Sequence, residues 1–274
     1  MELWFSEFQT KNVKISFKIN NVLHSSKSKY QKITVLETED YGRLLALDDL
    51  VMLTTKDEFF YHEMISHVPL LTHENPSKVL VIGGGDGGTI REIIKHPVKE
   101  IHLVEIDKEV IETSKKYFPS VSSGFSDPRV KVFCEDGIEF VKNNKGYDVI
   151  IIDSTDPIGP AVGLFSRAFY NDAYNSLNEN GIMVAQTESP IFCNQLIKRV
   201  YHDVSSIFAF TNLYTAVIPT YPGAYWTFTM GSKGINPLER EISNTPAFKT
   251  KFYCRELHKS YFILPPFLKE IIYK

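Results

Sequence analysis

Acidic side chains recur at four points where a short apolar run of the chain ends. Asp86 follows the run that begins at Lys78, Glu105 ends the next run, Asp136 follows the third, and Asp153 ends the fourth. The carboxyl ends of parallel strands meet at one edge of a sheet, where open α/β sheets bind ligands. Four carboxylates at that edge would repel one another. The pattern therefore predicts a site for cationic small molecules in preference to four coincidental helix caps.

A glycine-rich loop follows the first of these runs. Residues 83–88 read Gly-Gly-Gly-Asp-Gly-Gly, with the spacing G-x-G-x-x-G at Gly83, Gly85 and Gly88. Such a loop lets the backbone approach a ligand closely, and an acid about 20 residues further on commonly holds ribose hydroxyls. Glu105 fills that position. The loop and Glu105 together predict a nucleoside site.

Asp86 indicates which nucleoside this is. A dinucleotide would place its pyrophosphate at the helix start, where the Asp86 carboxylate would repel it. The same carboxylate attracts an ammonium group and opposes the tail carboxylate of S-adenosylmethionine. Decarboxylated S-adenosylmethionine has only a sulfonium and an ammonium. We therefore expect it as a co-substrate, with no tightly bound cofactor.

Two further strand-end segments carry acids. Residues 153–161 read Asp-Ser-Thr-Asp-Pro-Ile-Gly-Pro-Ala, so Asp153 and Asp156 precede a Pro/Gly run that predicts a loop able to cover a site. Asp136, followed by Gly137, has two compatible interpretations. It can accept a hydrogen bond from the adenine amino group, and it can cap the helix expected at residues 138–142.

The elements that must position these residues change in kind near residue 55. Before it, β-type runs cover residues 13–19, 31–37 and 43–47. After a helix expected at residues 57–71, apolar strands alternate with helices from Lys78 onward, which is typical of a parallel, doubly wound sheet. Residues 212–218 and 224–231 predict a closing antiparallel pair. We predict an α/β fold with a small antiparallel β-domain over residues 1–55 and a doubly wound α/β domain over residues 56–274.

Composition narrows the class of protein. The chain has 274 residues, 43% of them hydrophobic, and a net charge of -3, so a sizeable core is expected and nucleic acid is not an expected partner. No signal-peptide pattern or membrane-length apolar run is present. His62 and His67 lack the spacing of a zincin helix, and no metal is expected. The cysteines are far apart, which favours a cytoplasmic protein; they are Cys134, Cys193 and Cys254.

Together these segments resemble the polyamine aminopropyltransferase family, of the spermidine synthase type. The resemblance covers nearly the whole chain and rests on residues 4–5, 30–31, 61–64, 79–88, 105–107, 136–137, 153–161 and 218–223. It implies a Rossmann-like domain of the methyltransferase type behind the small β-domain. It also implies a homodimer or homotetramer built through the β-domain.

The resemblance implies roles for individual residues. Asp153 is expected to be the catalytic base. The residues expected to bind the donor are Gln31 and Asp86 for its aminopropyl end, Glu105 for ribose, Asp136 and Gly137 for adenine, and Gly83 and Gly85 in the loop. The residues expected to bind the diamine are Tyr61, His62, Asp153, Asp156, Gln186 and Tyr221, with Trp4 at the far end of the channel. His62 stands where some relatives have Gln, and residues 223–225 depart from the Ser-Gly that often follows Tyr-Pro.

The expected reaction is a direct displacement in which putrescine takes the aminopropyl group and methylthioadenosine leaves. Agmatine, cadaverine and spermidine remain alternative acceptors. Three other classes stay open. A small-molecule methyltransferase would share the fold. An NAD-dependent oxidoreductase would match the glycines and Glu105 but leave the other acids unexplained. A non-catalytic polyamine-binding module would leave the glycine loop unexplained.

Overall fold

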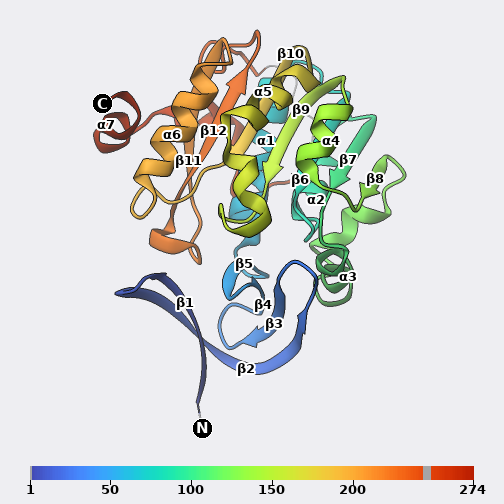
Figure 1. Cartoon of the computed structure of the whole chain (residues 1–274), viewed down its shortest axis with the longest axis vertical. Coiled ribbons are helices and arrows are strands. Elements are labelled where there is room, and N and C mark those ends of the chain that lie inside the picture. The colour runs from blue at the N-terminus through green and yellow to red at the C-terminus, as the bar shows by residue number, and fades with distance from the viewer. Residues whose placement is uncertain (1, 243–247) are drawn as a thin grey trace.

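The computed structural model describes residues 2–242 and 248–274. It contains a five-stranded antiparallel sheet in the order β1-β2-β3-β4-β5 and a seven-stranded mixed sheet in the order β11-β12-β10-β9-β6-β7-β8. The smaller sheet lies beneath one edge of the larger one (Figure 1). The predicted α/β class is confirmed.

The first sheet is more regular than the sequence indicates. Its strands are β1 (Leu3–Thr10), β2 (Val13–Lys27), β3 (Lys32–Thr38), β4 (Arg43–Leu47) and β5 (Leu50–Thr54). Apolar alternation locates β3, β4 and the first half of β2, but it misses β1 and β5. The polar second half of β2 is a strand because it pairs with β3 as far as Lys27, with irregularities near Asn21 and His24. Pairing decides here where propensity does not.

In the second sheet six of the seven strands run in the same direction, and one strand is antiparallel to its neighbours. Its strands are β6 (Lys78–Gly83), β7 (Glu100–Val104), β8 (Val130–Phe133), β9 (Tyr147–Asp153), β10 (Leu177–Gln186), β11 (Phe210–Val217) and β12 (Tyr225–Ser232). The predicted closing pair is confirmed as β11 and β12, with β12 antiparallel between β10 and β11. Strand order reverses between β6 and β9, whose ends pair at Gly83 and Asp153. Ligands bind at such a point in open α/β sheets.

Helices cover both faces of this sheet. They are α1 (Glu58–Thr72), α2 (Gly88–Ile93), α3 (Lys108–Tyr117), α4 (Gly137–Asn143), α5 (Arg167–Ser176), α6 (Asn194–Ser205) and α7 (Pro266–Tyr273). On β6, Val79 and Val81 pack in the cluster that contains α1 and α2, whereas Leu80 and Ile82 pack in the cluster that contains α4 and α5. Because successive side chains point to opposite faces and both faces are covered, the strand is apolar throughout.

The C-terminal segment, which the sequence patterns leave unplaced, is docked. The carboxylate of Glu63 on α1 accepts hydrogen bonds of 2.8 Å from the backbone N–H groups of residues 251, 252 and 253. Beyond it, Leu268 and Ile272 of α7 pack on Ile197 and Tyr201 of α6. Within residues 2–242 and 248–274, the structure has no helix with the length and apolarity needed to cross a bilayer.

Candidate active site

A cavity of about 360 Å³ opens at the carboxyl edge of β6, β7 and β9, with strands of the first sheet forming its opposite wall. Among the described residues, its lining includes every predicted site residue except Trp4. Those residues are Gln31, Tyr61, His62, Gly83, Gly85, Asp86, Glu105, Asp136, Gly137, Asp153, Asp156, Gln186 and Tyr221. The strand-end pattern thus marks residues that the fold brings together.

Trp4 lies elsewhere, and its placement differs from the expected far end of the channel. It is 55% exposed on β1, whereas Glu7 of the same strand is 4% exposed and lines the cavity. Side chains alternate across a strand, so residues three apart face opposite sides of the sheet. Within the single chain, β1 therefore presents Glu7 to the cavity, and a substrate contact by Trp4 stays a prediction.

Asp153 lies at the centre of the cavity, where β9 ends. The Tyr61 hydroxyl donates to its Oδ1 at 2.7 Å, and the Thr89 hydroxyl donates to its Oδ2 at 2.7 Å. Burial and then the negative charge of Asp86 raise the pKa of Asp153 above its ordinary value. A carboxylate with a raised pKa is a stronger base, and the two hydroxyls hold its orientation.

The glycine loop is shaped by Asp153 as well as by any ligand. Gly83 and Gly84 have positive φ angles of 81° and 68°. A Cβ on Gly83 would lie 2.2 Å from the carbonyl oxygen of Asp153, and one on Gly84 would lie 2.8 Å from its Oδ2. The loop therefore needs glycine to approach the end of β9 this closely.

We call the part of the cavity around Asp86, Glu105 and Asp136 the glycine-loop end. Glu105 is buried and accepts a hydrogen bond of 2.9 Å from the backbone N–H of Asp107. Burial raises the pKa of Glu105 to about 7. Gln31 reaches this end from the first sheet, where its Nε2 donates to Asp107 Oδ2 at 3.0 Å. The two sheets thus meet through a polar contact beside the predicted ribose position.

Asp136 fits both of its interpretations geometrically. Its Oδ1 accepts from the Ile138 N–H at 2.8 Å, so it caps α4. The residue is nevertheless exposed and lines the cavity together with Gly137. A cap leaves further lone pairs on the carboxylate for a ligand.

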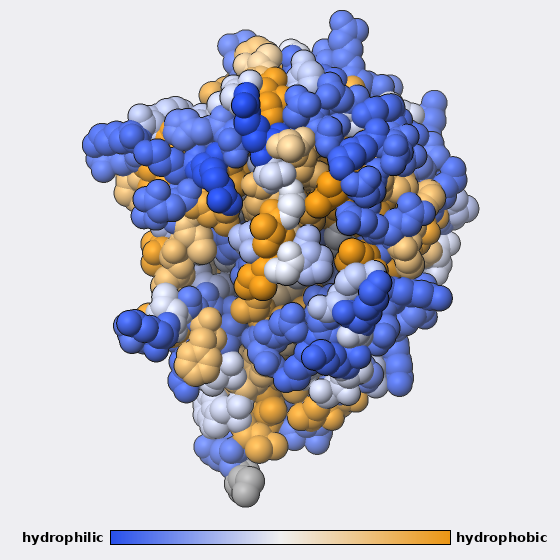
Figure 2. Space-filling view, in the orientation of Figure 1, coloured by the Kyte–Doolittle hydropathy of each residue, from blue (hydrophilic) through white to orange (hydrophobic). Residues whose placement is uncertain are grey.

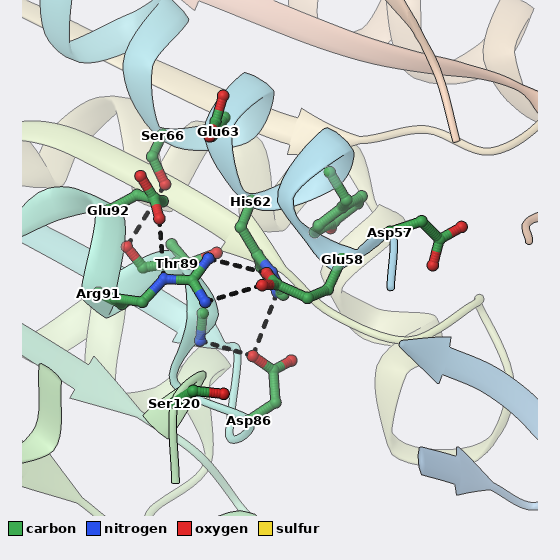
Figure 3. A network of polar contacts seen from close by, with 12 residues as sticks. Asp57, Glu58, His62, Glu63, Ser66, Asp86, Thr89, Arg91, Glu92 and Ser120 are labelled. Carbon is green, nitrogen blue, oxygen red and sulfur yellow. Dashed lines mark hydrogen bonds and ion pairs between the residues drawn. The ribbon is translucent and has the colours of Figure 1, made fainter. Parts of the chain in front are cut away.

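Asp86 has a partner that the sequence analysis did not foresee. Its Oδ1 accepts from the Gly88 N–H at 2.6 Å and lies 3.2 Å from Nε2 of His62 (Figure 3). Burial would raise the pKa of Asp86, but the charge and hydrogen bond of His62 outweigh it, and the pKa is lowered. Asp86 is therefore an ionised carboxylate in a mostly buried position.

The opposite part of the cavity, which we call the Asp156 end, gathers acids without such a partner. Glu188 lies behind the wall against Asp156, and burial followed by the Asp156 carboxyl raises the pKa of Glu188 to about 10. Its Oε1 is buried without a hydrogen bond. Burial also raises the pKa of Glu7. Burial and the neighbouring Asp156 thus favour the protonated form of Glu188.

Two predicted residues shape the Asp156 end through other contacts. Gln186 donates to the Ser154 carbonyl at 3.1 Å and accepts from the Glu188 N–H at 3.1 Å. The Tyr221 hydroxyl donates to the Met52 carbonyl on β5 at 2.6 Å, which ties this wall to the first sheet. Among the described residues, no group of three His, Cys, Asp or Glu side chains is arranged to hold a metal ion.

Sequence reasoning missed Glu188 and Glu7. Glu188 directly follows the fifth predicted strand, so the rule that finds Asp86 and Asp153 would have found it. Glu7 had no such signal, because it reaches the cavity from the other sheet.

Comparison with known proteins agrees with this geometry. Residues 58–241 match the spermine/spermidine synthase domain, and residues 3–55 match the spermidine synthase tetramerisation domain. The polyamine aminopropyltransferase of Caldicellulosiruptor bescii is 54% identical over 274 residues, with 99% of each chain covered. That of Bacillus subtilis is 52% identical over 273 residues, again with 99% of each covered.

Comparison with solved structures indicates the same family. A spermidine synthase in complex with the transition state analogue AdoDATO superposes with a TM-score of 0.95 at 42% identity. Spermidine synthase from Thermotoga maritima superposes with a TM-score of 0.92 at 40% identity. Both comparisons cover 98% of this chain and 94% of the other. The methyltransferase, oxidoreductase and binding-module alternatives are thereby set aside: the chain belongs to the polyamine aminopropyltransferase family and is an aminopropyltransferase.

Proposed function

We propose that the enzyme transfers the aminopropyl group of decarboxylated S-adenosylmethionine to putrescine, producing spermidine and methylthioadenosine. The observation that carries this proposal is the position of Asp153. It is buried between an end that suits a nucleoside with a cationic tail and an end lined by acids. A base at that junction lies beside both reacting groups.

The glycine-loop end suits the donor. Glu105 would accept from the ribose hydroxyls, and Asp136 from the adenine amino group. Asp86 would hold the ammonium of the aminopropyl group. Its Oδ1 already has two partners, whereas its Oδ2 has no hydrogen bond or ion pair among the described residues.

The Asp156 end suits a diamine. Asp156, Glu188 and Glu7 supply negative charge for a distal ammonium. The rings of Tyr61 and Tyr221, with centroids 5.7 Å apart, line the path to it and can pack against methylene groups and cations. Because the raised pKa of Glu188 favours its protonated form, an arriving ammonium would displace a proton from this side chain.

The chemical difficulty is the nucleophile. An alkylamine with a pKa near 10.4 is neutral in about one molecule in 2,500 at pH 7, which adds roughly 4.6 kcal/mol to the barrier. The donor's sulfonium lowers the amine pKa, and burial raises that of Asp153, so the two groups approach one another in basicity. The amine lone pair then attacks the carbon next to sulfur, the C–S electrons pass to sulfur, and the amine proton passes to Asp153.

We further propose that residues 1–55 and 56–274 act as separate domains and that the first carries the contacts of a homodimer or homotetramer. The family model that matches residues 3–55 supports this. So do the exposed apolar side chains of its first two strands, Leu3, Trp4, Phe8, Val13 and Val22. Apolar side chains appear at the lower end of Figure 2, where this sheet lies. Light scattering of a Trp4→Glu, Phe8→Glu variant should report a smaller particle than the unaltered enzyme.

The test of the reaction is product analysis by mass spectrometry. The enzyme is incubated with decarboxylated S-adenosylmethionine and, separately, putrescine, cadaverine, agmatine or spermidine. We expect spermidine and methylthioadenosine in equal amounts, with putrescine giving the highest kcat/KM. S-Adenosylmethionine serves as the control donor. Faster turnover of another amine would contradict putrescine as the acceptor. Methyl transfer would contradict decarboxylated S-adenosylmethionine as the donor.

A further inference from the structure

A row of charged side chains with alternating sign runs from Asp86 into the interior between α1 and α2 (Figure 3). His62 lies between Asp86, at 3.2 Å, and Glu58, at 2.6 Å. Both oxygens of Glu58 accept from the Arg91 guanidinium at 2.8 Å. The Nε of Arg91 donates to Glu92 at 2.8 Å. The reaction described above uses the Asp86 end of this row, whereas it gives no role to Glu58, Arg91 or Glu92.

The ring of His62 faces a carboxylate at each nitrogen, Nδ1 toward Glu58 and Nε2 toward Asp86. An ionised carboxylate only accepts hydrogen bonds, and a neutral imidazole has a single N–H. The hydrogen bond to Glu58 and the ion pair with Asp86 are therefore both favourable only when the ring carries two protons. Burial disfavours the charged ring, but Asp86 and Glu58 outweigh it and raise the pKa of His62 to about 10.

The backbone leaves space for the ring of His62. A Cβ on Gly88 would lie 2.3 Å from Cε1 of His62, so the last glycine of the loop leaves the space that the imidazole occupies. Glu58 and His62 stand one turn apart on α1, and the paired contact of Arg91 fixes the Glu58 carboxylate. Glu92 fixes Arg91 and is itself held by His67 and Lys95.

The other titratable groups around His62 do not replace Glu58. Tyr61 of α1 meets the ring edge to face at 5.5 Å, and Asp153 acts on it only through charge at the end of β9. Among the described contacts, Glu58 is therefore the acid that can hold the second proton, on Nδ1. Without an imidazolium beside it, the mostly buried Asp86 would tend to take up a proton.

We propose that Glu58 and Arg91 are positioning residues that hold His62 as an imidazolium on Oδ1 of Asp86. Asp86 thereby stays ionised, and its Oδ2 is available to the ammonium of the donor. The identity of that donor rests on the proposed function, whereas the protonation state of His62 does not.

The test uses Glu58→Gln, since a glutamine amide can donate to Nδ1 and keep the ring in place without a charge. NMR spectra of isotope-labelled histidine, with His62 assigned through His62→Gln, follow the ring from about pH 6 to about pH 9. We expect His62 of the unaltered enzyme to stay doubly protonated throughout and His62 of the variant to titrate within this range. Glu112→Gln, an exposed acid paired with Lys115, is the matched control.

Kinetics supply a second readout that a loss of stability alone would not produce. Glu58→Gln should raise the donor KM about tenfold, equivalent to one pKa unit of lost interaction, while kcat and the acceptor KM change less than about twofold. A His62 ring that titrates normally in the unaltered enzyme, or unchanged titration in Glu58→Gln, would overturn the inference.

Arg91→Lys keeps the cation and loses the paired contact, so it tests the same step should Glu58→Gln fail to fold. We expect His62 in this variant to deprotonate at a lower pH than in the unaltered enzyme, and an unchanged titration would overturn the inference. The spectra need no substrate. Absence of aminopropyl product would therefore refute the proposed function alone, and a neutral His62 in an active enzyme would refute this inference alone.

Discussion

At the glycine-loop end of the cavity, Asp86 lies against the ring of His62, and the charge of that ring is backed by Glu58 and Arg91. At the Asp156 end, Glu7 and Glu188 are equally buried. In the part of the chain that the structure describes, however, no lysine or arginine forms an ion pair with them. The pKa of Asp86 is lowered by its partner, whereas burial raises the pKa values of Glu7 and Glu188.

This contrast suggests a way for one cavity to receive two cations. At the glycine-loop end the lowered pKa of Asp86 favours an ionised carboxylate, so we expect donor binding there to need little rearrangement of charge. At the Asp156 end the raised pKa of Glu188 favours its protonated form, and we propose that this end becomes fully negative only when a diamine supplies the balancing charge. Asp153 lies between the two ends and borders both of them.

The largest effect should come from the group that the two ends share. Asp153→Asn keeps the shape of the side chain but removes the base, and loss of a general base costs about a thousandfold. Steady-state kinetics should show this decrease in kcat/KM for both substrates, with unchanged circular dichroism. Turnover near that of the unaltered enzyme would remove Asp153 from its assigned role.

Substitution of one acid at each end should separate the two sites. Asp156→Asn should raise the acceptor KM, and Asp86→Asn the donor KM, each by about thirtyfold, because a hydrogen bond to a charged partner is worth about 2 kcal/mol. Each variant is the other's control. If each variant raised the KM values of both substrates equally, the division of the cavity into two ends would be wrong.

Glu188→Gln should stabilise the protein and weaken binding of the acceptor. The pKa of Glu188 is raised to about 10, so the folded chain keeps a proton that the unfolded chain loses, and its contribution to stability falls as pH rises from about 4.5 toward 10. In the Glu188→Gln variant this loss of stability with rising pH is absent. Its free energy of unfolding at pH 8 should exceed that of the unaltered protein by about 2 kcal/mol.

Thermal unfolding across pH measures this difference, and Glu179→Gln, an exposed acid on β10, is the control. An unaltered protein with the same pH slope as Glu188→Gln would show that Glu188 is ionised in the folded state.

The smallest effect concerns the nucleoside. Glu105 has a pKa of about 7, and ribose hydroxyls that donate to its carboxylate should lower that pKa. Methylthioadenosine should therefore bind several-fold more tightly at pH 8 than at pH 6. Calorimetry measures this change, which should vanish in Glu105→Gln and persist in Glu109→Gln. Equal affinity at both values for the unaltered enzyme would contradict the predicted ribose contact.

The site residues that sequence patterns locate are those whose position follows from a local rule. Asp86, Glu105 and Asp153 each end or follow a buried strand, and parallel strands place such ends together. Glu58 and Arg91 resemble ordinary charges in the first turn of one helix and the last turn of another. Their contact exists only because α1 and α2 pack together.

The first sheet shows the same limit. Trp4 and Glu7 lie on a strand that apolar alternation did not reveal, so nothing local indicated which of them faces the cavity. The pairing of β1 with β2 decides that, and this pairing is a property of the folded sheet.

We expect the charge of the diamine to complete the Asp156 end. Calorimetric titration of putrescine into the enzyme with bound methylthioadenosine, in two buffers of different ionisation enthalpy, counts the protons exchanged on binding. At pH 8 the unaltered enzyme should release about one proton more than Glu188→Gln, because the ammonium displaces the Glu188 proton. Equal proton counts in the two proteins, or a net uptake by the unaltered enzyme, would contradict the claim.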